Sequence, residues 1–183
     1  SLATNGCCIN NNTDLDAIVN AFAGRKLVVQ LENHDFTCKY PNAGELATLR
    51  TWWVDLANKY KNNPYVWFNI MNEPGSGNIV TDDWKTIHED VVRAIRQTGA
   101  ENIIVLDGFA CGQENGYKRG EAGSGILTHG PYFVQNYPNI AFSLHLYADW
   151  IYGRQRLADY IDAVRAKGLS LHIGEYGSGV DYS

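Results

Sequence analysis

The run Asn102-Ile103-Ile104-Val105-Leu106-Asp107 sets four apolar residues directly before a carboxylate. A short run of this kind, rich in β-branched residues and ended by a polar one, is typical of a strand buried in a parallel sheet. Four further runs share this character: Leu27–His34, Tyr65–Asn72, Asn139–Tyr147 and Leu169–Glu175. The first residues of the five runs are separated by 38, 37, 37 and 30 residues, which indicates a repeated unit of strand and helix.

The segments between these strands have helical periodicity. In Ala43–Lys61, apolar residues recur every three or four positions and make one apolar face. Helices are also predicted over Asp82–Thr98, with its first residue as the cap and Gly99 after its end, and over Arg154–Ala166. An earlier helix, Leu15–Ala23, precedes the first strand. The alternation of strands and helices predicts an α/β fold with a parallel sheet.

The composition indicates one globular domain over residues 1–183, since 45% of the residues are apolar and 19% are charged. The net charge of −5 leaves no basic surface for nucleic acid or for an anionic membrane. No apolar run approaches the roughly 20 residues of a membrane-spanning helix. The first residues, Ser1 to Gly6, contain neither an initiator Met nor the apolar region of a signal peptide. We therefore expect a processed chain or a piece of a longer one.

Four cysteines permit three disulfide connectivities, and their spacing does not choose among them. Buried free thiols and one or two disulfides, formed in an oxidising compartment, both stay open. The absence of a CxxC pair weakens an interpretation as a zinc or redox motif. The cysteines are Cys7, Cys8, Cys38 and Cys111.

Polar or titratable groups close all five predicted strands. The strand ends are Asn33-His34-Asp35, Asn72-Glu73-Pro74, Leu106-Asp107-Gly108, His145-Leu146-Tyr147 and Gly174-Glu175-Tyr176. Each has a structural explanation when taken alone, and Asp107-Gly108, for example, is a good turn. In parallel α/β folds, however, the chemistry collects just past the carboxyl ends of the strands. Five such ends on one rim therefore predict a functional site.

Glu73 and Glu175 end the second and fifth predicted strands, so a closing barrel would set them across its mouth from each other. Two carboxylates in this arrangement can divide glycosidic cleavage, one protonating the leaving oxygen and the other attacking the anomeric carbon or activating a water. A separation of about 5–5.5 Å implies a covalent intermediate and retention, whereas about 6.5–9.5 Å implies inversion. The sequence leaves this distance open.

Three segments resemble signatures of glycoside hydrolase family 5, which contains (β/α)8-barrel endo-β-1,4-glucanases and endo-β-1,4-mannanases that act with retention: Phe68–Pro74, Ser143–Tyr147 and Ile173–Gly177. Leu27–Asp35 is similar to the third strand of bacterial members, especially mannanase-like ones. Ala3–Gly6 resembles the exit of their second strand. The order and spacing of these motifs agree with the family over essentially the whole chain.

The resemblance implies a secreted, retaining hydrolase of β-1,4-linked polysaccharide that needs no metal or organic cofactor. It implies that Glu73 is the general acid/base and that Glu175 is the nucleophile, with Tyr147 hydrogen-bonded to Glu175. Asn72 would hold the sugar hydroxyl beside the reacting carbon. The two histidines that would shape the subsite around the cleaved bond are His34 and His145.

Sugar rings bury their apolar faces on aromatic planes. Trp150, three residues beyond Tyr147 in a rim loop, is the predicted stacking platform. Trp52 and Trp53 lie inside a predicted helix and are expected to serve packing.

A long stretch after the third strand, Gly108–Tyr132, is rich in Gly and polar residues and is predicted to be a rim loop. Gln113 and Glu114 could face substrate there, although solvated positions are expected. The remaining histidines are expected at the surface or, for the last of them, in a structural position inside a strand: His88, His129 and His172.

Two residues of the family pattern have no counterpart, an arginine whose position falls just before Ser1 and a tryptophan whose position falls after Ser183. A complete barrel takes about 250 residues. We therefore predict a partial (β/α)8 barrel of five to six parallel strands that lacks strand 1, most of strand 2 and strand 8, with Leu2–Thr4 as the tail of strand 2. The resulting unpaired edges predict a homodimer or an exchange of elements, or else a poorly active fragment.

Three functions are considered. The first is a retaining endo-β-1,4-glycanase, and the second is a carbohydrate-binding or catalytically impaired barrel fragment that needs a partner chain. The third is a metal-dependent hydrolase, which no HxH or HExxH pairing supports, with the ligands His34, Asp35, His145 and Glu175. The substrate stays open, because Asn33-His34-Asp35 is mannanase-like whereas Asn72-Glu73-Pro74 is the commoner cellulase form.

Overall fold

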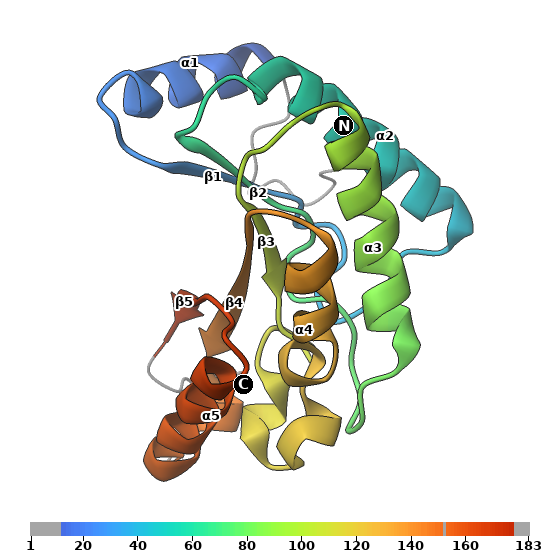
Figure 1. Ribbon diagram of the computed structural model, residues 1–183, viewed down its shortest axis with the longest axis vertical. Coiled ribbons are helices and arrows are strands. Elements are labelled where there is room, and N and C mark those ends of the chain that lie inside the picture. Colours follow the sequence, from blue (N-terminus) through green and yellow to red (C-terminus); the bar gives the residue numbers. More distant parts are fainter. Residues whose placement is uncertain (1–11, 152, 178–183) are drawn as a thin grey trace, which may run out of the picture.

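The computed structural model describes residues 12–151 and 153–177 and contains one sheet of five parallel strands. The strands pair in chain order, and each is hydrogen-bonded to the next one in the sequence. Figure 1 shows the sheet curling as an open half-barrel. The predicted partial barrel is therefore confirmed. The strands are β1 (Val29–Glu32), β2 (Val66–Asn69), β3 (Ile104–Asp107), β4 (Ile140–Leu146) and β5 (Leu171–Tyr176).

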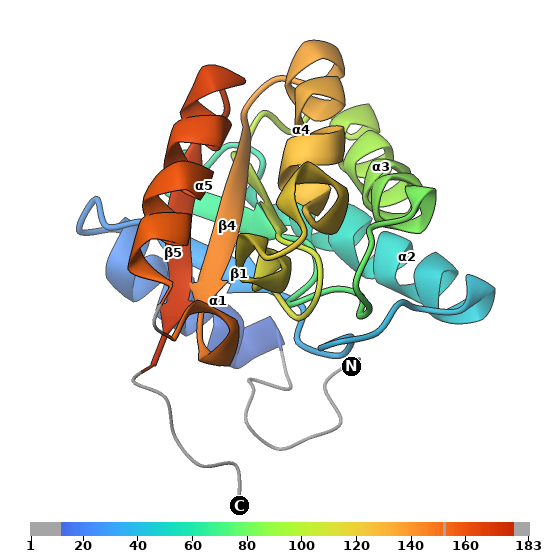
Figure 2. The same ribbon diagram turned by 90° about the horizontal axis from the view of Figure 1, so that it is seen from below.

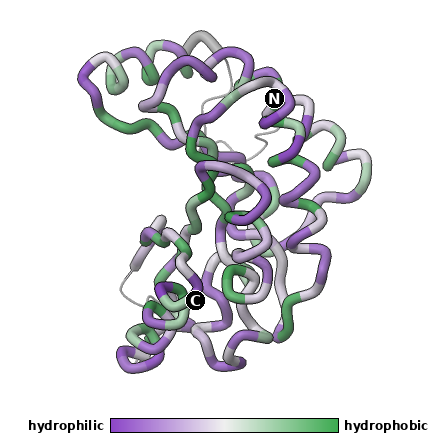
Figure 3. The backbone as a smooth tube through the Cα atoms, in the orientation of Figure 1, coloured by the Kyte–Doolittle hydropathy of each residue, from purple (hydrophilic) through white to green (hydrophobic). Residues whose placement is uncertain are grey.

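Within the described residues, five α-helices alternate with the strands and lie outside the curled sheet, as Figures 1 and 2 show. They are α1 (Asn12–Ala23), α2 (Ala43–Tyr60), α3 (Asp82–Gln97), α4 (Gly125–Asn136) and α5 (Arg154–Ala166). Hydrophilic and hydrophobic residues alternate along the outer helices in Figure 3, as amphipathic helices require. The predicted helices are confirmed to within a few residues at their ends. The cap of α3 is Thr81 rather than Asp82.

One helix, α4, contradicts the prediction of a single rim loop over Gly108–Tyr132. That stretch holds two short 3-10 turns, Glu114–Tyr117 and Gly120–Gly123, and then enters α4. Ser124 caps the helix by accepting a hydrogen bond from the Leu127 N–H at 2.9 Å. The glycines that suggested a loop permit close packing instead, since a Cβ at Gly125 would come within 2.9 Å of the Trp84 ring.

The core lies between the helices and the convex face of the sheet. Trp53 of α2 is fully buried against Phe68 of β2, and its Nε1 donates to the Ile70 carbonyl at 2.9 Å. The packing role expected for this tryptophan is confirmed, and Trp52 is half-buried beside it.

His88 was expected at the surface, which is wrong, because it is fully buried in α3. The His88 ring is buried because it finds partners in the core. Its Nδ1 lies 2.6 Å from the carbonyl oxygen of Trp84, and the ring packs edge-on against Phe133. Burial lowers the pKa of His88 to about 4, so the ring is neutral and tolerates the core. The side chain of His129 is also mostly buried, with 12% of it exposed.

A disulfide joins Cys38 to Cys111, which settles the choice between thiol and disulfide for these two residues. Cys7, Cys8 and the segment Leu2–Thr4 lie outside the described residues. None of the described helices has both the length and the apolar character needed to cross a bilayer.

Both edges of the sheet are open in the described part of the chain, because β1 and β5 each have a neighbouring strand on one side only. Apolar side chains stand exposed at these edges. Val28, just before β1, is 47% exposed, and Ile173 of β5 is 39% exposed. The predicted unpaired edges are therefore present in the described part of the chain, and an open seam lies between β1 and β5.

Candidate active site

The strand ends bring together both predicted catalytic carboxylates. Glu73 lies just after β2, His145 lies near the end of β4, and Glu175 lies near the end of β5. One carboxylate oxygen of each Glu and one ring nitrogen of His145 all lie within 4.8 Å of one another. The pairing of β4 with β5 shifts register between Leu144 and His145, so that Glu175 stands opposite His145.

His145 is the centre of this group and is 1% exposed. Its Nδ1 lies 2.9 Å from Glu73 Oε1 and 3.7 Å from Glu175 Oε2, while its Nε2 lies 3.2 Å from Asp107 Oδ2. Burial by itself would lower the pKa of His145, but the bonds to Asp107 and Glu73 outweigh it and raise the pKa to about 10. His145 is therefore a buried imidazolium at neutral pH, with carboxylates on both sides.

Asp107 is the residue that fixes His145 and Glu73 at once. Its carboxylate is fully buried and accepts hydrogen bonds from the Glu73 backbone N–H at 3.0 Å and from Asn69 Nδ2 at 2.8 Å. The sequence marked Asp107 as a strand end but explained it as a turn. Its position on the polar rim was the signal that could have placed it in the site.

The predicted hydrogen bond between Tyr147 and Glu175 is present, with the phenol donating to Glu175 Oε2 at 2.9 Å. Hydrogen bonds to a charged acceptor stabilise the charge. Glu175 is partly exposed, with 32% of its side chain accessible, whereas the Glu73 side chain is 13% exposed. The carboxyl groups of Glu73 and Glu175 are chemically identical but thus have different surroundings.

Asn72 is buried directly before Glu73. Its Nδ2 donates to Thr37 Oγ1 at 2.9 Å, and its Oδ1 has no hydrogen-bond partner among the described residues. A buried acceptor without a partner costs free energy that a ligand hydroxyl can recover. The substrate-binding role of Asn72 stays a prediction that this free oxygen favours.

Neither His34 nor Trp150 hydrogen-bonds to the paired carboxylates among the described residues. His34 is largely exposed, and its Nδ1 lies 2.7 Å from Glu32 Oε1 rather than from either catalytic candidate. Trp150 is only 7% exposed and packs edge-on against Tyr160 of α5. Both substrate-binding roles stay predictions, and the burial of Trp150 does not favour a sugar platform.

The four ligands of the metal hypothesis do not gather in the described part of the chain. The residues that could hold an ion there are Glu73, His145 and Glu175, without His34 or Asp35. Because His145 already bonds to Glu73 and Asp107, this group is better described as a hydrogen-bonded acid–base cluster.

Glu114 contradicts the expectation of a solvated loop residue, since it is fully buried. Its carboxylate accepts from the backbone N–H groups of Phe109, Gly125 and Ile126 and from two hydroxyls. Burial outweighs these bonds and raises the pKa of Glu114 to about 7. Nothing in the local sequence distinguishes this residue from a surface glutamate. The hydroxyl donors are Ser124 and Tyr160.

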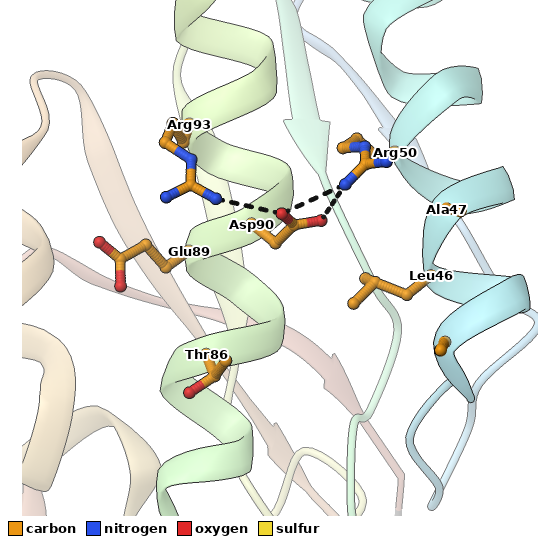
Figure 4. Close-up of a pocket in the computed structure, with 8 residues that line it drawn as sticks. Leu46, Ala47, Arg50, Thr86, Glu89, Asp90 and Arg93 are labelled. Atoms are coloured by element: carbon orange, nitrogen blue, oxygen red, sulfur yellow. Dashed lines mark hydrogen bonds and ion pairs between the residues drawn. The ribbon is translucent and has the colours of Figure 1, made fainter.

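A hollow between α2 and α3 lies on the outer helical layer and contains none of the predicted site residues (Figure 4). Asp90 of α3 pairs across the hollow with Arg50 Nη1 of α2 at 3.1 Å, and along its own helix with Arg93 Nη2 at 3.2 Å. Exposed ion pairs of this kind contribute little to stability. The other carboxylate that lines the hollow, Glu89, accepts hydrogen bonds from the hydroxyls of Tyr132 and Tyr137.

A parallel β/α half-barrel with two carboxylates joined through a histidine at the strand ends defines a glycosidase-like barrel domain. The family model named Cellulase (glycosyl hydrolase family 5) matches residues 5–182. The chain therefore belongs to glycosyl hydrolase family 5, as its motifs predicted.

Curated relatives include a mannan endo-1,4-beta-mannosidase of Cellvibrio japonicus, 26% identical over 88% of this chain and 37% of the relative. A beta-mannanase/endoglucanase A of Caldicellulosiruptor saccharolyticus is 30% identical over 84% of this chain and 11% of the relative. The chain thus spans well under half the length of either relative.

The solved structures agree in fold. The catalytic domain of a mannanase from Streptomyces sp. SirexAA-E superposes with a TM-score of 0.77 at 25% identity, over 96% of this chain and 55% of that one. The endo-beta-1,4-glucanase Xac0029 from Xanthomonas axonopodis pv. citri gives a TM-score of 0.74 at 23% identity, over 94% of this chain and 60% of that one.

Proposed function

We propose that this chain carries the catalytic pair of a retaining endo-acting glycoside hydrolase of β-1,4-linked polysaccharide. The observation that carries the proposal is the proximity of the two carboxylates, whose nearest oxygens in the cluster lie within 4.8 Å. A short separation favours a covalent intermediate, because an inverting enzyme needs about 6.5–9.5 Å to admit a water between the carboxyl groups.

In the proposed reaction, Glu175 attacks the anomeric carbon while Glu73 protonates the departing glycosidic oxygen. Tyr147 supports Glu175 through its 2.9 Å hydrogen bond. His145 supports the second role of Glu73, because a charged imidazole 2.9 Å from Glu73 Oε1 orients the carboxylate that Glu73 becomes after it has given its proton to the leaving group, and stabilises its charge. Water then enters, Glu73 takes its proton, and the sugar is released with its configuration retained.

The substrate class rests on family membership and on the names of the relatives, which include both mannanases and endoglucanases. Either polymer suits the proposal. Secretion is also proposed, since the Cys38–Cys111 disulfide fits an oxidising compartment.

Glycosidase activity is tested by release of reducing sugar from glucomannan and from carboxymethylcellulose. Glu73→Ala and Glu175→Ala should each lower turnover by at least about 100-fold, as removal of general acid–base or nucleophilic groups does. Glu101→Gln is the matched control and should keep full activity, because this exposed carboxylate precedes the amino end of β3, whereas the site lies at the carboxyl ends of the strands.

Azide distinguishes the two roles, since a small anion can replace a missing carboxylate. With an activated aryl glycoside, Glu175→Ala should give the α-glycosyl azide, and Glu73→Ala the β-glycosyl azide. Unchanged activity in Glu175→Ala would remove the nucleophile assignment. Binding of oligosaccharide without any turnover by the parent chain would favour the alternative of an impaired barrel fragment.

We further propose that a second copy of this chain closes the seam by pairing or by exchange of elements. Support comes from the open edges of β1 and β5 and from the exposed Val28 and Ile173 beside them. A barrel completed in this way would also shield the partly exposed Glu175.

A further inference from the structure

The Cys38–Cys111 disulfide crosses the turn that carries Glu73. Cys38 lies in the loop after β1 and Cys111 in the loop after β3, while the Glu73 turn follows β2 between them. In a parallel sheet of this order, the two loops flank the turn on either side. The covalent bond therefore joins the neighbours of the candidate acid/base rather than remote parts of the fold.

Backbone hydrogen bonds from both cysteines hold the turn itself. The Cys38 N–H donates to the Glu73 carbonyl at 2.7 Å, and the Cys111 N–H donates to the Gly75 carbonyl at 3.1 Å. The Gly75 N–H donates in turn to the Lys39 carbonyl at 3.1 Å. The turn from Glu73 to Gly75 is thus bound on both sides by the residues that the disulfide ties together.

The residue after Cys111 touches both members of the acid–base pair. The Gly112 carbonyl accepts from the backbone N–H of His145 at 2.9 Å. A Cβ at Gly112 would lie 2.8 Å from His145 Nδ1 and 3.1 Å from Glu73 Cγ, so the backbone here is in close contact with both side chains. A displacement of this loop would change the Glu73–His145 geometry directly.

The three clamped residues also have unfavourable backbone conformations. Cys38, Glu73 and Cys111 have φ values of 59°, 49° and 54°, in the left-handed region. Such a conformation is unfavourable for a residue with a side chain and persists only where its surroundings enforce it. Loss of the covalent tie would let these residues relax toward commoner conformations and move Glu73 away from His145.

We propose that the Cys38–Cys111 disulfide is a redox-sensitive clamp that positions Glu73 against His145, so that a dithiol reductant switches off acid/base function while the fold persists. The proposal rests on the proposed function of Glu73. Cys38 is exposed and Cys111 half-buried, so a reductant has access. The reductant thiolate attacks one sulfur and forms a mixed disulfide. Its second thiol then releases both cysteine thiols and leaves the reductant as a cyclic disulfide.

The test is dithiothreitol treatment, with thiol counting to verify reduction and far-UV circular dichroism to verify the fold. We expect kcat on polysaccharide to fall by about 100-fold, the order of loss that a misplacement of about 1 Å produces. Cys38→Ser/Cys111→Ser should show the same loss and no further response to the reductant. Cys7→Ser/Cys8→Ser is the matched control and should keep both the activity and the response of the parent.

Leaving-group dependence separates positioning of Glu73 from general damage. In a dinitrophenyl glycoside, the dinitrophenolate leaves without being protonated. The rate of glycosyl transfer from this substrate to Glu175 should therefore fall far less than the rate of polysaccharide hydrolysis. Equal losses on both substrates, or full polysaccharide activity after verified reduction, would overturn the clamp.

An NMR titration of His145 keeps the clamp testable if the parent shows no turnover. Reduction should lower the pKa of His145, because the ring loses Glu73 Oε1 as a partner. An unchanged His145 titration after reduction would contradict the clamp. If the parent chain shows no turnover but reduction still lowers the pKa of His145, the proposed function is contradicted and the clamp is not.

Discussion

At the scale of single residues, the buried Asp107 sets the orientation of the His145 ring and of the Glu73 backbone. It binds the ring of His145, the backbone of Glu73 and the amide of Asn69 with one buried carboxylate. A histidine whose second nitrogen is held by a carboxylate has a fixed orientation and an elevated basicity. Asp107 is therefore a positioning residue for the proposed reaction.

The replacement Asp107→Asn should neutralise this partner with little change in shape. We expect the pKa of His145 to fall from about 10 toward the ordinary value of about 6.5. We expect kcat to drop by about 100-fold because Glu73 loses its alignment. NMR titration and a pH–rate profile measure both effects. Asp55→Asn, at an exposed position of α2, is the control.

The contact between His145 and Asp107 should also make the free energy of unfolding depend on pH. Because folding raises the pKa of His145, its favourable interaction is complete below about pH 6.5 and is lost as pH rises through about 10. The stability gap between parent and Asp107→Asn should therefore narrow over this range. A gap that stays constant from pH 6.5 to 10 would show that His145 is not charged in the folded chain.

At the scale of elements, Glu114 fastens the start of α4 to the exit of β3. Its carboxylate accepts from Gly125 and Ile126 at the helix N-terminus and from Phe109 after the strand. An acidic group at a helix N-terminus also complements the helix dipole. The position of α4, and the loop that leads to it, therefore depends on one buried side chain.

Glu114 should make a distinct contribution to the pH dependence of stability. Its pKa is raised from 4.5 to about 7, so the folded state binds the proton more tightly and stability falls as pH rises between these values. Relative to Glu114→Gln, the parent should lose about 3 kcal/mol of unfolding free energy from pH 4.5 to pH 8. Denaturant unfolding at both pH values measures this difference, with Glu101→Gln as control. A parent that gains unfolding free energy relative to Glu114→Gln as the pH rises would refute the expectation.

The sequence predicted those parts of the fold whose signal is local. Strand runs such as Ile104–Asp107 and the periodic faces of α2 and α3 follow from residue type and spacing alone. Glu73 and Glu175 could be placed together because parallel strands end on one rim. The burial of His88 and Glu114 could not be predicted, since it depends on partners such as Phe133 and Tyr160 that are distant in sequence.

At the scale of the whole molecule, the curled sheet has two unfinished edges in its described part. Edge strands with exposed apolar side chains pair readily with other chains, and an inserted lysine blocks such pairing. Val28→Lys, beside β1, should therefore reduce self-association in sedimentation experiments and leave the monomer folded. Ile79→Lys, at an exposed apolar residue outside the sheet, is the control. Association that is equal in both variants would exclude β1 as the contact.

The pairing of each strand with its sequence neighbour also bears on how the chain is made. Contacts between adjacent repeats close short loops, so they cost little entropy and can form one unit after another during synthesis. β5 is the last described strand to leave the ribosome, and it holds Glu175. A nascent chain that ends before β5 thus already holds the candidate acid/base but not the candidate nucleophile, and the catalytic pair comes into being only once β5 has been added to the sheet.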